Sequence, residues 1–321
     1  MVLATPLDSS SALAAHYERM RAAVTALVVG QDQALQLAFV ALLCDGHVLF
    51  QGVPGVAKTL LVRSLAGVLG TRFGRVQFTP DLMPSDIIGS PIYHSSSNDF
   101  RFRPGPIFTD LLLGDEINRA PAKTQAAMLE AMQERAVTVD GQRHALSPVF
   151  TVFATQNPIE QEGTYPLPEA ELDRFLFRID MDYPAQADEL RMLALHHAED
   201  PAPGSIASLF TADSLRAARQ VVRAIQVRAE VLGYALNLIR ATRDDANLAV
   251  GGSPRAGLWL VRAAKAVAAL AARDYVTPED VQAVWCPALR HRVVLEPGAE
   301  VEGLSADQAL REVIKRVPIP H

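Results

Sequence analysis

A glycine-rich turn between an apolar segment and a helical segment constrains the fold of this chain most tightly. The apolar segment is residues 47–51, the turn is Gly52–Thr59 (GVPGVAKT), and residues 58–69 carry apolar side chains at helical spacing. A turn of this kind at the start of a helix directs backbone N–H groups at phosphate oxygens. The sequence therefore predicts a phosphate-binding loop that follows a buried strand; a plain turn with a surface lysine is the alternative for the loop alone.

The side chains of Lys58 and Thr59 supply the chemistry of this loop. We expect Lys58 at the β- and γ-phosphates of a nucleotide and the Thr59 hydroxyl on Mg²⁺. Ala57 stands where the consensus motif has glycine, which is tolerated if its φ is negative. The full set of residues expected to contact the nucleotide is Val29, Gly30, Gly52, Val53, Pro54, Gly55, Val56, Ala57, Lys58, Thr59 and Leu60.

A second apolar segment, residues 111–114, ends in the acids Asp115 and Glu116. Ligands of open α/β sheets bind at the carboxyl ends of the strands, so this pair is expected beside the loop. We expect Asp115 to hold Mg²⁺ and Glu116 to orient the water that attacks the γ-phosphate. The alternative for an isolated acidic pair is a solvated turn, or Glu116 as a helix cap.

Three further polar residues are candidates for reading the γ-phosphate. Asn157 follows the apolar strand predicted over residues 149–155. Arg174 is expected to reach the nucleotide of a neighbouring subunit, with Arg178 as the competing candidate. Arg255 lies in the first turn of a predicted helix, where a cation opposes the helix dipole and a bound anion is a favourable partner.

The sequence pattern changes near residue 184. Residues 1–184 mix strand and helix signals, with hairpins predicted within 89–105 and 137–146; Asp140-Gly141 is a strong turn signal in the second. Residues 185–321 carry helix signals and no clear strands. We therefore predict an α/β core with a parallel sheet over 1–184 and an all-helical domain over 185–321.

Composition narrows the class of protein. The 321 residues are 49% hydrophobic and 21% charged, which suits a packed globular fold. The net charge of −6 argues against a general attraction to nucleic acid. The two cysteines, the lack of a signal peptide and the lack of a membrane-length apolar stretch lead us to expect a cytoplasmic protein without a membrane span.

These motifs together resemble the MoxR family of AAA+ ATPases. The segments that carry the resemblance are 52–59, 111–121, 125–134, 153–158 and 251–256, and the most specific lies within 115–135. The similarity extends from Val29 to about Leu295. Alanine at position 57 is itself usual in that family.

The resemblance implies a P-loop αβα core, a helical lid, and ATP and Mg²⁺ as ligands. It implies a homo-oligomer, typically a hexameric ring, that remodels or matures client proteins, often with an adaptor carrying a von Willebrand factor A domain. It assigns Asn157 as sensor 1, Arg174 as the arginine finger in trans, and Arg255 as sensor 2, which we expect to tie the lid to the γ-phosphate. Gln77 is expected to switch Glu116, and the client is not identified.

Three other functions stay open at this point. A nucleic-acid motor would use the basic residues of the two hairpins, Arg101, Arg103, Arg143 and His144. A small-molecule P-loop kinase would leave Asn157, the candidate arginines and the helical domain without roles. A scaffold that binds ATP without turnover is disfavoured by Glu116.

Overall fold

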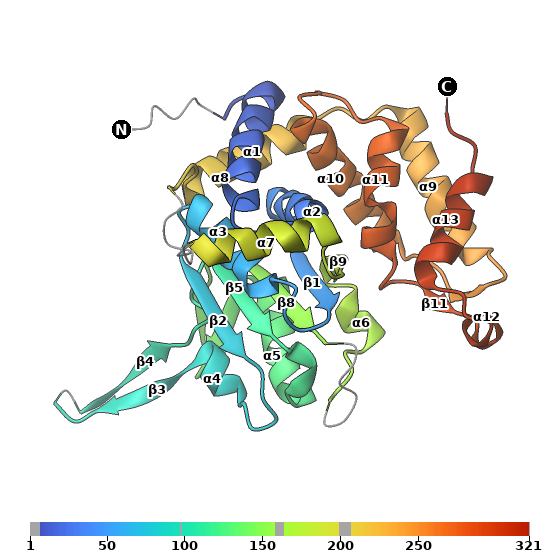
Figure 1. Cartoon of the computed structure of the whole chain (residues 1–321). Coiled ribbons are helices and arrows are strands. Elements are labelled where there is room, and N and C mark those ends of the chain that lie inside the picture. Colours follow the sequence, from blue (N-terminus) through green and yellow to red (C-terminus); the bar gives the residue numbers. More distant parts are fainter. Residues whose placement is uncertain (1–6, 97, 158–163, 199–206, 321) are drawn as a thin grey trace.

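A five-stranded parallel sheet forms the centre of the protein (Figure 1). The computed structural model describes residues 7–96, 98–157, 164–198 and 207–320. The strand order is β2-β5-β8-β1-β9, and every pair is parallel, so the carboxyl ends of the strands meet at one edge. The strands are β1 (His47–Gly52), β2 (Phe73–Gln77), β5 (Leu111–Asp115), β8 (Thr151–Gln156) and β9 (Phe175–Met181).

Helices cover both faces of this sheet. Helices α1 (Ser10–Thr25), α2 (Asp32–Leu43) and α3 (Lys58–Val68) lie on one face, and α5 (Ala122–Glu134) lies on the other (Figure 1). Strand β5 shows the consequence, because Leu111 and Leu113 belong to the hydrophobic cluster of α1–α3 whereas Leu112 belongs to that of α5. Strands buried on both faces read as continuous apolar runs, as this one does.

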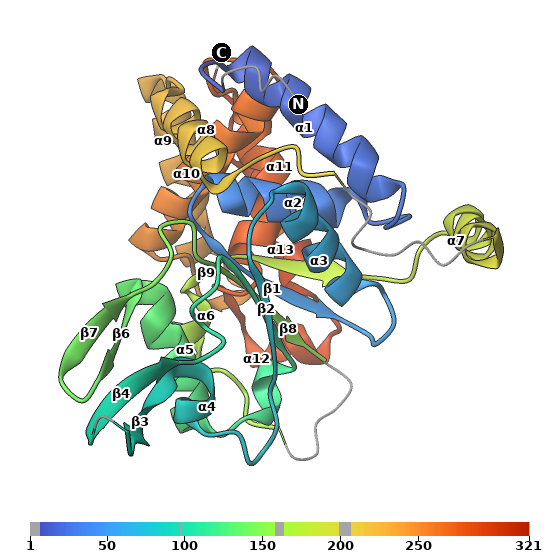
Figure 2. The ribbon, with the colours of Figure 1, turned by 90° about the vertical axis from the view of Figure 1, so that its left-hand side faces the viewer.

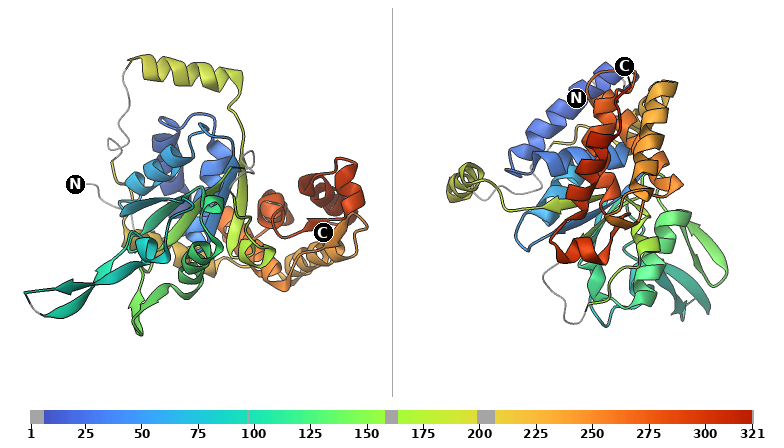
Figure 3. Two further views of the ribbon diagram at one scale, coloured as in Figure 1. Left: turned by 90° about the horizontal axis from the view of Figure 1, so that it is seen from below. Right: turned by 90° about the vertical axis from the view of Figure 1, so that its right-hand side faces the viewer.

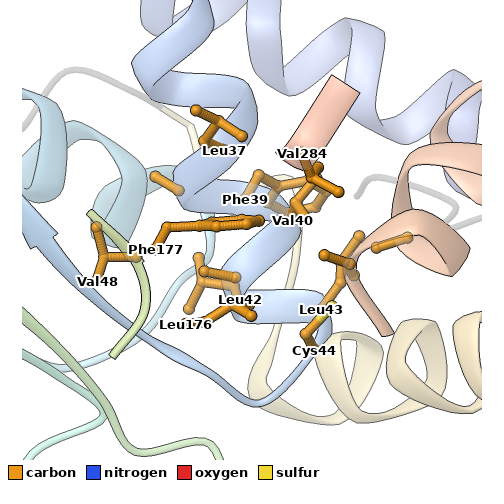
Figure 4. Close-up of a cluster of buried hydrophobic side chains, with 14 of the residues drawn as sticks. Leu37, Phe39, Val40, Leu42, Leu43, Cys44, Val48, Leu176, Phe177 and Val284 are labelled. Atoms are coloured by element: carbon orange, nitrogen blue, oxygen red, sulfur yellow. The ribbon is translucent and has the colours of Figure 1, made fainter. Parts of the chain in front are cut away.

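The larger cluster continues from the sheet into the helical part of the chain. Figure 4 shows Leu37, Phe39 and Val40 of α2 between Phe177 of β9 and Val284 of α11 (Pro278–Leu289). Helix α2 contacts β9 on one side and α10 (Pro254–Leu270) on the other, and α1 also packs on α10. The helices after the sheet are therefore built onto the first two helices of the chain.

Both predicted hairpins are confirmed. The first is β3 (Gly89–His94) with β4 (Asp99–Pro104), and the second is β6 (Ala136–Val139) with β7 (Gln142–Ala145). In the second turn Asp140 has φ 50° and Gly141 has φ 74°, the positive pair that a type I′ turn requires. Figure 1 shows β3 and β4 extending away from the sheet beyond the short helix α4 (Pro84–Ile88).

An aromatic contact joins the two hairpins. The rings of Phe102 on β4 and His144 on β7 are stacked with their centroids 4.1 Å apart. Phe108, which follows β4, meets Phe102 edge-on at 5.5 Å. Figure 2 shows the hairpins side by side below the sheet. The two hairpins therefore form one connected surface.

The remainder of the chain is mainly helical. The sequence predicts no strands in it, and this prediction is wrong in one place. Leu248 and Val250 of β10 (Leu248–Val250) pair with β11 (Val294–Leu295) in a small antiparallel ribbon. The further helices are α6 (Glu169–Leu172), α7 (Gln186–Ala198), α8 (Ala212–Ala224), α9 (Ala229–Arg243), α12 (Pro297–Val301), α13 (Ala306–Arg316) and a 3₁₀ turn (Ile117–Arg119). Within the described ranges, no helix has both the length and the apolar character needed to cross a membrane.

Local capping signals set the starts of several of these helices. Ser253 accepts a hydrogen bond from the Ala256 backbone N–H at the start of α10, and Thr211 caps α8 in the same way. The sheet ends with β9 at Met181, and α7 and α8 follow before the remaining helices. The domain boundary near residue 184 stays a prediction.

Candidate functional site

The glycine-rich loop connects β1 to α3 at the carboxyl edge of the sheet. Gly52 packs directly on β9, because an added Cβ would lie 2.3 Å from the Met181 carbonyl oxygen. Gly55 has φ +87°, and no atom lies within 4 Å of the position of its missing Cβ. The loop therefore packs against β9 at Gly52. Around Gly55 it leaves space that a ligand could occupy.

The backbone φ of Ala57 is positive, although the sequence analysis expected a negative value. Its φ is 64° and its ψ is 21°, in the left-handed region, at the residue that caps the start of α3. The loop needs this conformation to enter the helix, and glycine is the residue that adopts it without strain. Ala57 therefore keeps the backbone conformation of the consensus motif despite its methyl group.

Lys58 faces the two acids of the predicted site. Its Nζ donates a hydrogen bond to the Gly52 carbonyl oxygen at 2.6 Å. Burial lowers the pKa of Lys58, and the negative charges of Asp115 and Glu116 act in the opposite direction. The structure therefore brings the loop lysine and both acids together, while their catalytic roles stay predictions.

Asp115 is held by two residues that the sequence analysis missed. The Thr155 hydroxyl donates to its Oδ1 at 2.6 Å, and Arg75 Nη2 lies 2.7 Å from its Oδ2. Each missed residue lies two positions before a predicted one, Arg75 before Gln77 and Thr155 before Asn157. Alternate residues of a strand share a face, so that spacing is the signal that was available.

Glu116 has a strained backbone and two side-chain partners. Its φ is 57°, which is unusual for a non-glycine residue and is a form of strain that recurs at functional sites. Gln77 Nε2 donates to its Oε2 at 2.7 Å, and Arg119 Nε lies 3.1 Å from the same oxygen. The predicted contact between Gln77 and Glu116 is present, and its switching role stays a proposal.

The oxygen donors at the site suit a magnesium ion. Thr59 in the first turn of α3 offers a hydroxyl and Asp115 a carboxylate. Within the described residues, no group of three or more His, Cys, Asp or Glu side chains could hold a metal. Mg²⁺ commonly takes one or two protein oxygens and completes its shell with phosphate and water, so this donor set fits the ion.

A cavity of about 300 Å³ lies beside the loop. Val28, Val29 and Gln31 form one wall, Ala57 lies on another, and α7 closes a third with Met192 and other residues. Its apolar lining suits the base of a nucleotide. Gly30 lines an adjacent polar cavity with Asp180 and Arg290, and its contact with the nucleotide stays a prediction.

The three candidate γ-phosphate readers do not lie together. Asn157 is buried directly after β8, whose last residue Gln156 is paired with Gln51 of β1. Arg174 and Arg255 instead line a separate cavity of about 640 Å³, which we call the arginine pocket. This pocket is lined by Leu43, Cys44, Asp45, His47, Met132, Gln133, Arg135, Arg174, Val222, Arg223, Leu232, Arg255, Leu258, Trp259, Val261, Arg262 and Lys265.

The expectation that Arg255 ties the lid to the nucleotide of its own subunit stays a prediction. Neither Arg174 nor Arg255 lines the cavity beside the loop. Helix α10, which carries Arg255, packs against α1 and α2.

Several cations of the arginine pocket have no acidic partner among the described residues, namely Arg174, Arg223, Arg255, Arg262 and Lys265. Among the residues that the structure describes, neither Arg174 nor Arg255 forms a side-chain ion pair or hydrogen bond. Arg178, the competing candidate, is paired with Asp180 at 3.1 Å. Arg174 is therefore the better candidate for a group that acts on another molecule.

Comparisons with known proteins agree with this architecture. The model of the ATPase family associated with various cellular activities (AAA) matches residues 47–177, and an AAA lid domain matches residues 240–313. The chain is 42% identical to Chaperone MoxR1 of Mycobacterium tuberculosis, over 98% of this chain and 86% of that protein. It is 33% identical to Protein MoxR of Methylorubrum extorquens, over 96% and 95% of the two chains. The chain belongs to the MoxR family of AAA+ ATPases.

Two further relatives support the MoxR assignment over the whole length. An uncharacterized protein of Bacillus subtilis, YeaC, is 43% identical over 92% of both chains. A crystal structure of a proposed ATPase from Cytophaga hutchinsonii superposes with a TM-score of 0.91, at 37% identity and 97% coverage of both chains. The MoxR-family fold, a P-loop sheet with a helical lid, is therefore shared along this chain. Pro158, which ends one of the matching motifs, lies outside the described residues.

Proposed function

We propose that this chain hydrolyses ATP within a head-to-tail ring of identical subunits and uses the cycle to remodel or mature client proteins. The observation that carries the proposal is the convergence of Lys58, Asp115 and Glu116 at the carboxyl edge of the sheet. Phosphoryl transfer needs placement and charge stabilisation more than covalent chemistry, and these three residues provide both.

The loop and its lysine would bind the triphosphate. Lys58 exchanges its hydrogen bond to the Gly52 carbonyl for the phosphate oxygens. Thr59 and Asp115 would hold Mg²⁺, which neutralises phosphate charge when it is bound. Arg75 and Thr155 fix the Asp115 carboxylate from two sides, so that it does not swing away.

Glu116 would act as the general base. Its carboxylate accepts a hydrogen bond from Gln77 and is paired with Arg119. To accept a proton from the attacking water, the carboxylate turns from Gln77 toward the γ-phosphate. The Glu116 backbone N–H stays bound to Thr155 Oγ1 at 2.9 Å, so this is a side-chain motion only. Asn157 places the water from the adjacent strand.

Arg174 and Arg255 would both act on the nucleotide of the next subunit. They line one pocket, have no acidic partner among the described residues, and do not line the cavity beside their own loop. A head-to-tail ring would bring this pocket to the loop of a neighbour, and heterologous contacts form such rings when the rotation between subunits closes. The resemblance suggests a hexamer.

The client-directed part of the proposal draws on a relative and on the hairpins. One relative is named a chaperone. Tyr93 and Phe100 on the first hairpin are 51% and 67% exposed, an aromatic surface away from the nucleotide. We place client or adaptor contact here, and an adaptor with a von Willebrand factor A domain is the candidate partner.

A phosphate-release assay with a parallel nucleotide-binding measurement tests the chemistry. Glu116→Gln should bind ATP within a few fold of the parent and hydrolyse it at least about 100-fold more slowly, because the general base is lost. Lys58→Ala should lose binding. Glu130→Gln, an exposed acid on α5, is the matched control and should change neither. Parent-like turnover by Glu116→Gln would remove Glu116 from the mechanism.

A further inference from the structure

Helix α7 packs on Gly30 through Asp188 in its first turn, and the rest of the helix extends away from the protein. Figures 2 and 3 show it separated from the sheet and from the other helices. Ala187, Leu190, Leu193 and Ala194 recur at helical spacing and are all exposed; Leu190 and Leu193 are 68% and 71% exposed. We call these four residues the α7 stripe. Such a stripe on a helix normally packs on another surface, and within the described chain it has none.

The place of α7 ties it to the nucleotide. Glu189, Met192 and Leu193 line the cavity that Gly55 and Ala57 share. The helix therefore borders the cavity that suits the base of the nucleotide. A neighbouring subunit that contacts this flank of the loop would come close to α7.

The arginine pocket offers the complementary surface on the opposite flank. Figure 2 places α7 on one side of the molecule and α5, α9 and α10 on the other. Leu232 and Leu258 of the pocket are 45% and 65% exposed, and Trp259 lies beside Leu258. These apolar side chains have the size and exposure to receive two leucines.

Charge favours the same pairing. The pocket lining carries five arginines and one lysine but only one acid, Asp45. The first turn of α7 carries Asp188 and Glu189, while its single arginine, Arg191, is paired with Asp188 at 3.1 Å. Complementary charge steers association and fixes orientation. A negative helix start opposite a positive pocket therefore favours one direction of docking.

We propose that α7 of one copy docks on the arginine pocket of the next, with the α7 stripe against Leu232, Leu258 and Trp259. This inference rests on the head-to-tail assembly proposed above and names the contact that holds it together. Arg174 shares a cavity with Leu258, and Ala57 shares one with Leu193. Bringing Arg174 to a neighbour's nucleotide therefore brings these two apolar surfaces face to face.

Sedimentation velocity of the full chain with ATP, in the Glu116→Gln background, tests the contact. We expect Leu190→Asp and Leu258→Asp each to weaken association at least tenfold. Leu195→Asp is the matched control, because Leu195 is on the same helix, 41% exposed, and outside the stripe; it should shift association less than twofold. Fluorescent-nucleotide binding by each variant reports whether the cavity is intact.

The outcomes separate this inference from the proposal that it extends. If the parent and Leu190→Asp assemble equally well, the proposed docking of α7 is wrong and the proposed ring is unaffected. If the parent remains a monomer at all concentrations, the docking of α7 and the head-to-tail ring are both wrong. A disulfide between separately expressed Leu190→Cys and Leu258→Cys chains, absent when Leu195→Cys replaces the first, would confirm the pairing; equal cross-linking by both would overturn it.

Discussion

At the scale of the residue, Ala57 shows how one backbone angle decides the behaviour of a loop. Its φ of 64° places a Cβ where L-residues are strained by about 1–2 kcal/mol. The helix that follows holds the angle, because the Ala57 carbonyl accepts the Leu61 N–H at 2.9 Å. The strain is stored in the loop that we propose to bind the phosphates, and backbone strain is common at functional sites.

We expect Ala57→Gly to raise the free energy of unfolding of the nucleotide-free protein by up to about 1 kcal/mol, because glycine adopts this φ freely. Gly55→Ala should lower it by about 1 kcal/mol, since its φ is +87° and the added Cβ meets no atom within 4 Å, leaving only backbone strain. Urea unfolding of both variants measures the pair. A loss of stability in Ala57→Gly would mean that the methyl group contributes packing that exceeds the strain.

At the scale of the element, Asp45 joins three helices at the junction of the sheet and the lid. It follows α2 and lies 2.9 Å from Arg135, which ends α5, and 2.7 Å from Arg219 of α8. Burial lowers the pKa of both arginines, and the negative charge of Asp45 opposes this shift. One carboxylate thus balances two guanidinium groups, and Arg219 has only 6% of its side chain exposed.

Asp45→Asn should lower the free energy of unfolding by about 1–3 kcal/mol, because two partly buried cations lose their counter-charge. Asparagine tolerates the φ of 58° at this position, so the backbone is not the cause. Glu312→Gln breaks an exposed pair with Lys315 within α13 and should cost less than about 0.5 kcal/mol. Equal chemical stability of the two variants would show that Asp45 does not hold this junction.

Elements with signals inside a few residues were predictable from the sequence, and contacts between distant elements were not. The glycine-rich loop and the Asp140-Gly141 turn depend on local backbone chemistry, and both are where the sequence places them. The pair between Arg75 and Asp115 joins strands 40 positions apart, so no local pattern reveals it. The side on which Arg255 lies depends on how α10 packs, which spacing within α10 does not encode.

At the scale of the whole molecule, the loop and the arginine pocket occupy different flanks, and neither flank makes a complete site alone. The loop cavity contains no arginine from the pocket, and the pocket contains no residue of the loop. In the proposed ring a second copy would supply what each flank lacks. Turnover would then be a property of the interface between subunits.

Mixing inactive subunits tests this property. Arg174→Ala chains retain an intact phosphate-binding loop but lack the arginine, whereas Lys58→Ala chains retain Arg174 but lack the loop lysine. Random 1:1 rings should regain up to about a quarter of parental turnover, the share of interfaces that pair an intact loop with an intact arginine. Replacing the second partner by the Lys58→Ala/Arg174→Ala double variant should abolish the recovery. No recovery in rings shown by mass spectrometry to be mixed would contradict action in trans.

The ring stack of Phe102 on His144 has a mechanical consequence. The first hairpin leads into β5, which carries Asp115 and precedes Glu116, and the second leads into β8, which precedes Asn157. A force applied at the tip of β3–β4 would therefore act on both hairpins, which lead into neighbouring strands. If Glu116 and Asn157 have the roles proposed above, such a force would reach both residues together and would change the rate of ATP hydrolysis.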